Sequence, residues 1–184
     1  MAKKVLILAG DCVEAQEIFY PYYRLKEEGI EVKVAAPTKK PLQTVVHDFV
    51  EGVETYVEFK GYAFPWVDLS FKDVKPEEFD GILIPGGRAP EYIRLNPELE
   101  KIVRYFMEEN KPVGAICHGA IVLSCYGLVK GRKLTSYSAV KPDIEAAGGE
   151  YVDAEVVVDG NLVTSRAWPD LPAWMREFMR LLKS

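Results

Sequence analysis

A short apolar run near the N-terminus, Val5 to Leu8, ends at Ala9-Gly10. An uninterrupted run of this length is typical of a strand buried on both faces, as parallel sheets require. Residues 14 to 28 then show a helical pattern that stops at Gly29, and "EVKVAAP" predicts a second strand. Strand, helix and strand in this order make a right-handed crossover unit. The chain is therefore expected to fold as an α/β sandwich.

The same pattern returns later in the chain. "FDGILIPGG" and "PVGAIC" predict two further buried strands, and "NPELEKIVRYFMEENK" and "HGAIVLSCYGLVKG" predict the helices that follow them. The last part predicts a short strand "KLTSY", a helix around "VKPDIEAAGG", a ribbon "AEVVVDGNLVTS" with an Asp159-Gly160 turn, and a terminal amphipathic helix.

At 184 residues the chain has the length of one domain, 1–184, and needs no disulfide or metal to bury a core. Residues 38 to 75 interrupt the regular alternation, because they are rich in aromatic and β-branched residues with partial alternation. We interpret this stretch as short antiparallel strands that form an inserted flap at about 40–68.

Composition excludes several partners. The chain is 48% hydrophobic and 28% charged, with a net charge of -5 and no basic block, so nucleic acid is not an expected partner. The first apolar run is too short to span a membrane and no cleavage site follows it, so a cytoplasmic protein is expected. The odd number of cysteines, Cys12, Cys117 and Cys125, indicates reduced thiols.

The segment "VGAICHG" places Cys117 at the end of a predicted parallel strand, where ligands bind in open α/β sheets. Small residues around it resemble the tight turn of a nucleophile elbow, and the N-terminus of the next helix stabilises a thiolate. A buried structural cysteine is the alternative. Cys125, farther along that helix, is expected in the core, and Cys12 is expected to be packed rather than redox-active.

Only two histidines are available as a base, and His118 adjoins the candidate nucleophile. His47 lies in the flap, where packing or substrate contact is the favoured role. Glu14 follows the first strand, and adjacent parallel strands would bring it towards the same cleft, where partial burial raises the pKa of a carboxyl. A solvated glutamate at a helix start is the alternative for Glu14.

"PGGRAPE" supplies the remaining candidates. The backbone N–H groups of Gly86 and Gly87, with that of His118, could form an oxyanion site. Glu91 could orient His118 from the same chain or from a neighbouring one, and Arg88 is expected in an ion pair. No metal-ligand spacing such as HExxH or CxxC occurs, so neither a metal nor a cofactor is expected.

Together these segments resemble the ThiJ/PfpI superfamily over nearly the whole chain. The resemblance is carried by "LAGDCVEAQEI", "FDGILIPGGRAPEYIRLNPEL", "KPVGAICHG", "LVKGRKLTSY" and "VVVDGNLVTSRAWPDLPAWMREF", which occur in the family's order. The flap is similar to that of the plant two-copy glyoxalase-type members, while "YPYYRLKEEG" and "WMREFMRLLK" are similar to the archaeal PfpI-type peptidases.

The resemblance implies a three-layer sandwich with a mainly parallel, flavodoxin-like sheet, as in class I glutamine amidotransferases, and a nucleophile elbow. It implies that Cys117 is the nucleophile and that Glu14 hydrogen-bonds it. In the PfpI branch His118 is paired with Glu91 across a subunit interface, and Gly87 and His118 offer oxyanion-hole amides. The family also implies a homo-oligomer: a dimer, trimer or hexamer.

Three functions are weighed. The first is cofactor-independent, glyoxalase III-type conversion of methylglyoxal or glyoxal, small α-oxoaldehydes, to a hydroxy acid, also measurable as deglycase activity. The second is a cysteine peptidase with Cys117, His118 and Glu91 acting on peptides. The third is a redox-sensing stress protein or chaperone in which Cys117 is oxidised. The aromatic flap suits a small closed pocket, so the α-oxoaldehyde reaction is preferred.

Overall fold

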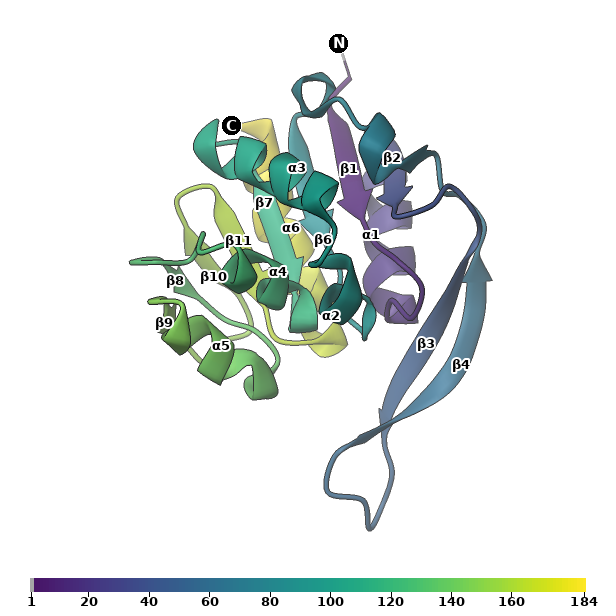
Figure 1. Ribbon diagram of the computed structural model, residues 1–184, viewed down its shortest axis with the longest axis vertical. Helices are drawn as coiled ribbons and strands as arrows, with labels where there is room; N and C mark the ends of the chain where they lie inside the picture. Colours follow the sequence, from purple (N-terminus) through teal and green to yellow (C-terminus); the bar gives the residue numbers. More distant parts are fainter. Residues whose placement is uncertain (1) are drawn as a thin grey trace.

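The computed structural model describes residues 2–184 and is built around one mainly parallel sheet (Figure 1). The sheet has seven strands in the order β10-β11-β7-β6-β1-β2-β5, and only β10 runs antiparallel to its neighbour. The strands are β1 (Lys4–Leu8), β2 (Glu31–Ala36), β5 (Leu69–Ser70), β6 (Gly81–Ile84), β7 (Val113–Ile116), β10 (Val157–Asp159) and β11 (Leu162–Ser165). The sequence prediction of a three-layer α/β sandwich is confirmed.

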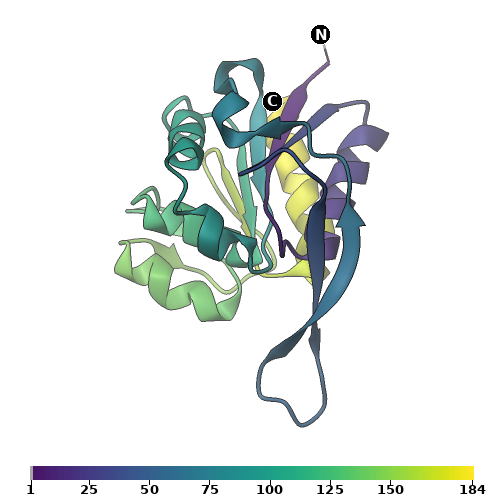
Figure 2. The ribbon, with the colours of Figure 1, turned by 45° about the vertical axis from the view of Figure 1, so that its right-hand side comes forward.

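Helices cover both faces of the sheet (Figure 2). α1 (Ala15–Glu27) and α6 (Leu171–Lys183) lie on one face, and α2 (Ala89–Ile93), α3 (Pro97–Glu108), α4 (Ala120–Cys125) and α5 (Lys141–Ala146) on the other. β1 shows why two cores form. Because side chains alternate along a strand, Val5 and Ile7 enter the core with α1 and α6, while Leu6 and Leu8 enter the core with α3 and α4.

A side-chain cap begins helix α1, and a glycine follows its end. Glu14 is its N-cap and accepts a hydrogen bond from the Glu17 backbone N–H at 3.0 Å. Ile18, Tyr22 and Leu25 bury one face, and Gly29, at φ +73°, turns the chain towards β2. The predicted strand-helix-strand unit is therefore present.

A long antiparallel hairpin projects below the body of the protein in Figure 1. Its strands are β3 (Leu42–Phe49) and β4 (Tyr56–Phe64), so the expected flap is made of longer strands than predicted. Two backbone hydrogen bonds join β3 to the segment after β1: Cys12 N to Gln43 O at 2.7 Å and Val45 N to Val13 O at 2.9 Å. The hairpin is thus attached directly to the segment that follows β1.

The C-terminal third completes the sheet and adds a small ribbon. β8 (Lys133–Leu134) and β9 (Glu150–Tyr151) pair in parallel beside α5, and β10 and β11 form the predicted hairpin. Its two-residue loop is Gly160-Asn161, because Asp159 still pairs with Leu162. Single 3-10 turns, η1 to η5, occupy Phe71–Asp73, Pro76–Glu78, Cys117–Gly119, Ser138–Val140 and Trp168–Asp170.

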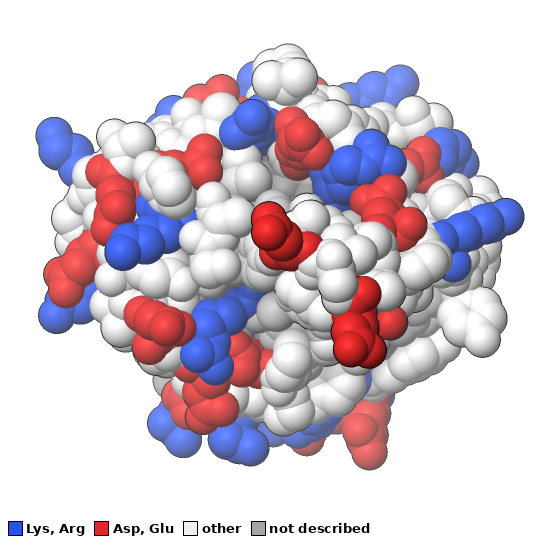
Figure 3. Space-filling view, turned by 90° about the horizontal axis from the view of Figure 1, so that it is seen from below, with Lys and Arg blue, Asp and Glu red and all other residues white. Residues whose placement is uncertain are grey.

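The parallel strands all end at the lower edge of the sheet, from which the hairpin also projects (Figure 1). Seen from this side, acidic and basic side chains alternate around apolar and neutral surface, without a large area of one sign (Figure 3). No helix within residues 2–184 is long and apolar enough to cross a membrane.

Candidate active site

Cys117 lies at a sharp turn between a strand and a helix. β7 ends at Ile116, and Cys117 adopts φ +60° in the 3-10 turn that leads into α4. A positive φ is unfavourable for a residue with a side chain and is the mark of a nucleophile elbow. The turn passes so close to β6 that a Cβ on Gly119 would lie 2.4 Å from the Ile84 carbonyl oxygen. The expected elbow is present, and it presents Cys117 at the carboxyl edge of the sheet.

The Cys117 sulfur is surrounded by hydrogen-bonding groups although the residue is only 2% exposed. Its Sγ lies 3.2 Å from His118 Nδ1, and the backbone N–H groups of Gly87 and His118 face it. The N–H of Gly86 is instead donated to Glu17 Oε2 at 2.8 Å. Of the three expected oxyanion donors, Gly87 and His118 are therefore placed at the sulfur, and Gly86 is not.

The carboxyl beside the thiol is Glu17, and the expectation that Glu14 hydrogen-bonds Cys117 is wrong. Glu14 is the helix cap, so its side chain turns back to the Glu17 backbone N–H. Glu17, one helical turn further on, points to the elbow. A Cβ on Gly86 would lie 2.5 Å from Glu17 Oε2 and 2.6 Å from the Cys117 Cβ, so carboxyl and thiol flank the same glycine.

Both carboxyls are completely buried, and this controls their protonation. Burial raises the pKa of Glu14 to about 7, against hydrogen bonds from backbone N–H groups. Burial also raises the pKa of Glu17 well above its ordinary value, and the neighbouring Glu14 carboxyl raises it further. Each carboxyl has one oxygen, Oε1, without a hydrogen-bond partner among the described residues. Burial therefore favours the protonated form of Glu17.

The pKa of the Cys117 thiol is raised and that of the His118 imidazole is lowered, and both changes favour the uncharged group. Burial raises the pKa of Cys117, the Glu17 carboxyl adds to this, and the N–H groups of Gly87 and His118 oppose it. Burial lowers the pKa of His118 to about 4, with a further contribution from His47 and an opposing one from Asp143. An uncharged His118 can accept a proton through Nδ1, which lies 3.2 Å from the sulfur.

Aromatic rings cover the elbow. The His118 ring lies 5.1 Å from that of Tyr137 and 6.0 Å from that of Tyr56, and 6.5 Å from that of His47. Tyr56 and His47 both come from the hairpin, so β3 and β4 supply one wall of the site. A cavity of about 240 Å³ opens beside this wall and is lined by Tyr56, Gly87, Arg88, Glu91, Arg94, His118, Ile121 and Asp143.

Glu91 lines this cavity but does not reach His118 within the chain. Its side chain is exposed on α2, and no hydrogen bond joins it to His118 among the described residues. The expected orientation of His118 by Glu91 is therefore not present within one chain.

Arg88 forms the expected ion pair, with Nη2 3.2 Å from Glu58 Oε1 on β4. The same nitrogen lies 2.9 Å from the Cys12 sulfur. Cys12 adopts φ +65° and is partly buried, and burial raises the pKa of its thiol despite the charge of Arg88. Cys125 is exposed, so its expected place in the core is wrong: it lies on the outer face of the last turn of α4, whose neighbouring residues Leu123 and Ser124 are buried.

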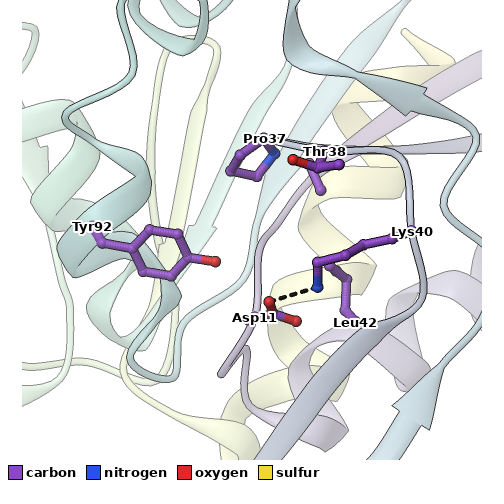
Figure 4. A pocket seen from close by; sticks show the side chains of 7 residues that line it. Asp11, Pro37, Thr38, Lys40, Leu42 and Tyr92 are labelled. Atoms are coloured by element: carbon purple, nitrogen blue, oxygen red, sulfur yellow. Dashed lines mark hydrogen bonds and ion pairs between the residues drawn. The ribbon is translucent and has the colours of Figure 1, made fainter.

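A second, smaller hollow of about 190 Å³ lies beside the end of β1 (Figure 4). Asp11 forms an ion pair with Lys40 there at 2.6 Å, and the Tyr92 hydroxyl points towards Asp11. Asp11 also accepts a hydrogen bond from the Gln43 backbone N–H at 3.0 Å. None of the residues that line this hollow belongs to the surroundings of the Cys117 sulfur. The contacts of Asp11 with Lys40 and Gln43 attach the base of the hairpin to the segment that follows β1.

The sequence analysis did not single out Glu17, Tyr56 or Glu58. Glu17 could have been found, because a spacing of three residues from Glu14 places two side chains on neighbouring positions of one helix face. The positions of Tyr56 and Glu58 at the site depend on which residues of the two hairpin strands pair with each other, and the sequence does not show this pairing. Among residues 2–184, no group of three or more His, Cys, Asp and Glu side chains is arranged to hold a metal ion.

Fold and site together define an α/β protein with a buried cysteine at a nucleophile elbow, next to a histidine and a glutamate whose burial favours their uncharged forms. The profile of the DJ-1/PfpI family matches residues 3–181, and the chain belongs to this family. It is 49% identical to a deglycase of Pyrococcus abyssi over 180 residues, which cover 98% of this chain and 99% of the relative.

Two further comparisons agree with this membership. The chain is 38% identical to protein/nucleic acid deglycase 2 of Escherichia coli, with 99% of each chain covered. Among solved structures, it is similar to a two-domain protein of Anabaena variabilis with DJ-1/ThiJ/PfpI-like and ferritin-like domains. That likeness has a TM-score of 0.83 at 34% identity and covers 98% of this chain and 48% of the other.

Proposed function

We propose that the protein is an enzyme that converts small α-oxoaldehydes such as methylglyoxal to hydroxy acids without a cofactor. The observation that carries this proposal is the 3.2 Å approach of the Cys117 sulfur to an uncharged His118 inside a covered site. A nucleophile, a base and a protonated carboxyl are the groups that such a reaction needs.

In the first step the Cys117 sulfur adds to the aldehyde carbon of the substrate. The thiol proton passes to His118 Nδ1 and then to the new oxygen, which gives a hemithioacetal. While the oxygen carries negative charge, the N–H groups of Gly87 and His118 stabilise it. The thiol has to lose its proton only at the moment of attack, which is compatible with a resting thiol that is protonated.

In the second step a proton moves from the former aldehyde carbon to the neighbouring carbonyl carbon through an enediol. This transfer leaves a thioester between Cys117 and the hydroxy acid. We assign removal of the carbon-bound proton to the uncharged His118, which returns it to the neighbouring carbon. The Glu17 carboxyl, which lies beside the thiol, donates its proton to the neighbouring carbonyl oxygen as the enediol forms and takes a proton from the hydroxyl of the former aldehyde carbon as the thioester forms, with Glu14 as the neighbouring ionisable group. Water then hydrolyses the thioester, so that methylglyoxal and one water give lactic acid and the free thiol.

The relatives support a related substrate. The proteins of Pyrococcus abyssi and Escherichia coli are named deglycases. An aldehyde that has added reversibly to a protein amine or thiol is released as free aldehyde, which the same Cys117 would consume. Glycated groups and free aldehyde are therefore two sources of one substrate class for this site.

Peptide cleavage is supported less well. A peptidase of this type needs an oriented histidine and an open groove for an extended chain. In this chain Glu91 makes no hydrogen bond to His118, and the hairpin covers a thiol that is 2% exposed. Oxidation sensing also depends on a thiolate, whereas burial raises the pKa of Cys117.

The test is lactate formation from methylglyoxal in the absence of glutathione, with wild type, Cys117→Ala and Cys125→Ala. Labelled casein is digested in parallel. We expect lactate from wild type and from Cys125→Ala, whose cysteine is exposed and outside the site, and none from Cys117→Ala. Cys117-dependent casein cleavage without lactate would replace this proposal by the peptidase.

A further inference from the structure

His47 is a buried histidine that the mechanism above does not use. It is 3% exposed although it belongs to the projecting hairpin, and its Nε2 lies 2.9 Å from Glu58 Oε2. The two residues are direct cross-strand partners in the β3–β4 register. A buried imidazole with a carboxylate partner is held in one orientation, because moving it would leave a polar group unsatisfied.

Glu58 connects this histidine to the body of the protein. Its other oxygen, Oε1, forms the ion pair with Arg88 at 3.2 Å. Partial burial raises the pKa of Glu58, but the hydrogen bonds from His47 and Arg88 outweigh it and leave the pKa below its ordinary value. Arg88 directly follows Gly87, whose N–H faces the Cys117 sulfur. His47, Glu58 and Arg88, which we call the clamp, therefore connect the hairpin to the elbow.

The ring of His47 also holds the aromatic wall. It stacks on Tyr56, with ring centres 4.2 Å apart and planes 26° apart, and it lies at 74° to the His118 ring. Tyr56 in turn contacts Tyr137, with ring centres 5.7 Å apart. Burial raises the pKa of Tyr56 and of Tyr137, and a negative charge on Cys117 would raise both further. Both hydroxyls therefore interact electrostatically with the sulfur.

We propose that His47 is a positioning residue, which, through its hydrogen bond to Glu58, holds Tyr56 and the hairpin closed over Cys117 and His118. This role rests on the proposed function only for its effect on turnover, since closure over the thiol is a property of the protein itself. A closed wall confines a small aldehyde next to the sulfur and the imidazole and excludes bulk water.

Removal of the clamp should therefore slow turnover and speed the labelling of Cys117. Turnover falls, because the substrate and His118 are no longer confined. Reaction of Cys117 with a bulky maleimide becomes faster, because the hairpin opens. A residue that only stabilised the fold would speed Cys117 labelling no more than its loss of unfolding free energy accounts for, and urea unfolding of each variant measures that loss.

The experiment compares His47→Leu, which loses the hydrogen bond, with His47→Gln, whose amide nitrogen can still donate to Glu58. Lys60→Gln is the control on the same hairpin, because Lys60 is exposed and outside the clamp. Glu58→Gln weakens the clamp from its other side and serves if His47→Leu does not fold. Labelling is followed at each cysteine by mass spectrometry, with exposed Cys125 as the internal reference.

We expect His47→Leu to lose about tenfold in kcat for methylglyoxal and to gain several-fold in Cys117 labelling, at unchanged Cys125 labelling. His47→Gln should keep most of the turnover and the slow labelling. Equal behaviour of the Leu and Gln variants, or slower turnover without faster labelling, would overturn the proposal. If wild type makes no lactate, the proposed function fails, and the labelling contrast alone decides the role of His47.

Discussion

The carboxyl of Glu17 and the thiol of Cys117 lie on either side of Gly86, with Glu17 Oε2 also bound to the Gly86 N–H at 2.8 Å. This arrangement holds a carboxyl whose burial favours the protonated form next to the Cys117 thiol. Glu14 lies behind it as the helix cap, at the distance of one hydrogen bond to the Glu17 backbone. Glu17 is therefore the carboxyl beside the thiol, and Glu14 is the carboxyl that caps the helix.

Substitution of the two carboxyls should separate these two roles. Glu17→Gln removes the proton donor beside the sulfur, and we expect kcat for methylglyoxal to fall on the order of a hundredfold. Glu14→Gln keeps the cap, because the amide oxygen still accepts from the Glu17 N–H, and should lose less than about tenfold. Steady-state kinetics of both variants measure this. A larger loss for Glu14→Gln would return the catalytic carboxyl to Glu14.

The acid limit of activity should be set by His118. Since burial lowers the pKa of His118 to about 4, the imidazole remains neutral and able to accept the thiol proton at about pH 5. We expect kcat/KM of the Glu14→Gln variant, in which the carboxyl of similar range is absent, to decline only towards pH 4. A decline centred near 6.5, the ordinary value for histidine, would show that His118 is not held neutral in this way.

Glu14 should also make stability depend on pH. Its pKa is 4.5 when the chain is unfolded and about 7 in the folded protein, so the folded state holds the proton more tightly. The resulting stabilisation is complete below pH 4.5 and is lost as the pH rises through 7, which amounts to about 3 kcal/mol. Glu14→Gln should therefore gain stability relative to wild type between pH 4 and about pH 8 in urea unfolding. An unchanged difference between the two proteins would contradict the raised pKa.

Substitution of Gly87, with Gly29 as its control, tests how tightly the turn at the site is packed. Both adopt φ +73°, but a Cβ on Gly87 would lie 2.3 Å from the Glu14 nitrogen, while one on Gly29 meets nothing within 4 Å. Gly29→Ala should cost about 1 kcal/mol of unfolding free energy, from backbone strain alone. Gly87→Ala should cost about 3 kcal/mol or more and abolish turnover. Similar costs for both would mean that the Gly87 turn can relax.

Glu91 should matter little for aldehyde turnover if one chain makes the site. Glu91→Gln is then expected to change kcat by less than about twofold, because Glu91 makes no hydrogen bond to His118 within the chain. We also expect a homo-oligomer from the family resemblance, and sedimentation of the purified protein tests this. A large loss in Glu91→Gln, together with an oligomer, would indicate that the glutamate acts from a neighbouring subunit.

Local patterns were sufficient to predict most of the sheet. The strands β1, β2, β6 and β7, the β10–β11 ribbon, the helices α1, α3, α4, α5 and α6 and the elbow at Cys117 were predicted, because each depends on a short apolar or periodic run and its flanking residues. The short strand β5 and the short helix α2 were not predicted. The exposure of Cys125 was not predicted, since a continuous apolar stretch does not show which face of its helix is covered.

The remaining parts of the site depend on geometry that a single sequence does not contain. Whether Glu14 or Glu17 faces the thiol depends on the residue at which α1 begins, since this decides which of them becomes the cap. The pairing of His47 with Glu58 depends on the hairpin register, which shifts at an irregularity between Gln43 and Val45. His118, in contrast, was found by its adjacency to Cys117.

The base of the hairpin is formed by Leu42 and Phe64, which are register partners and are both buried. The chain thus leaves and re-enters the body at one point, and the strands between contribute little to the two cores. Lengthening such an insert adds only a small entropic cost to folding. A change in the length of this segment should therefore leave the sheet and the cysteine turn intact.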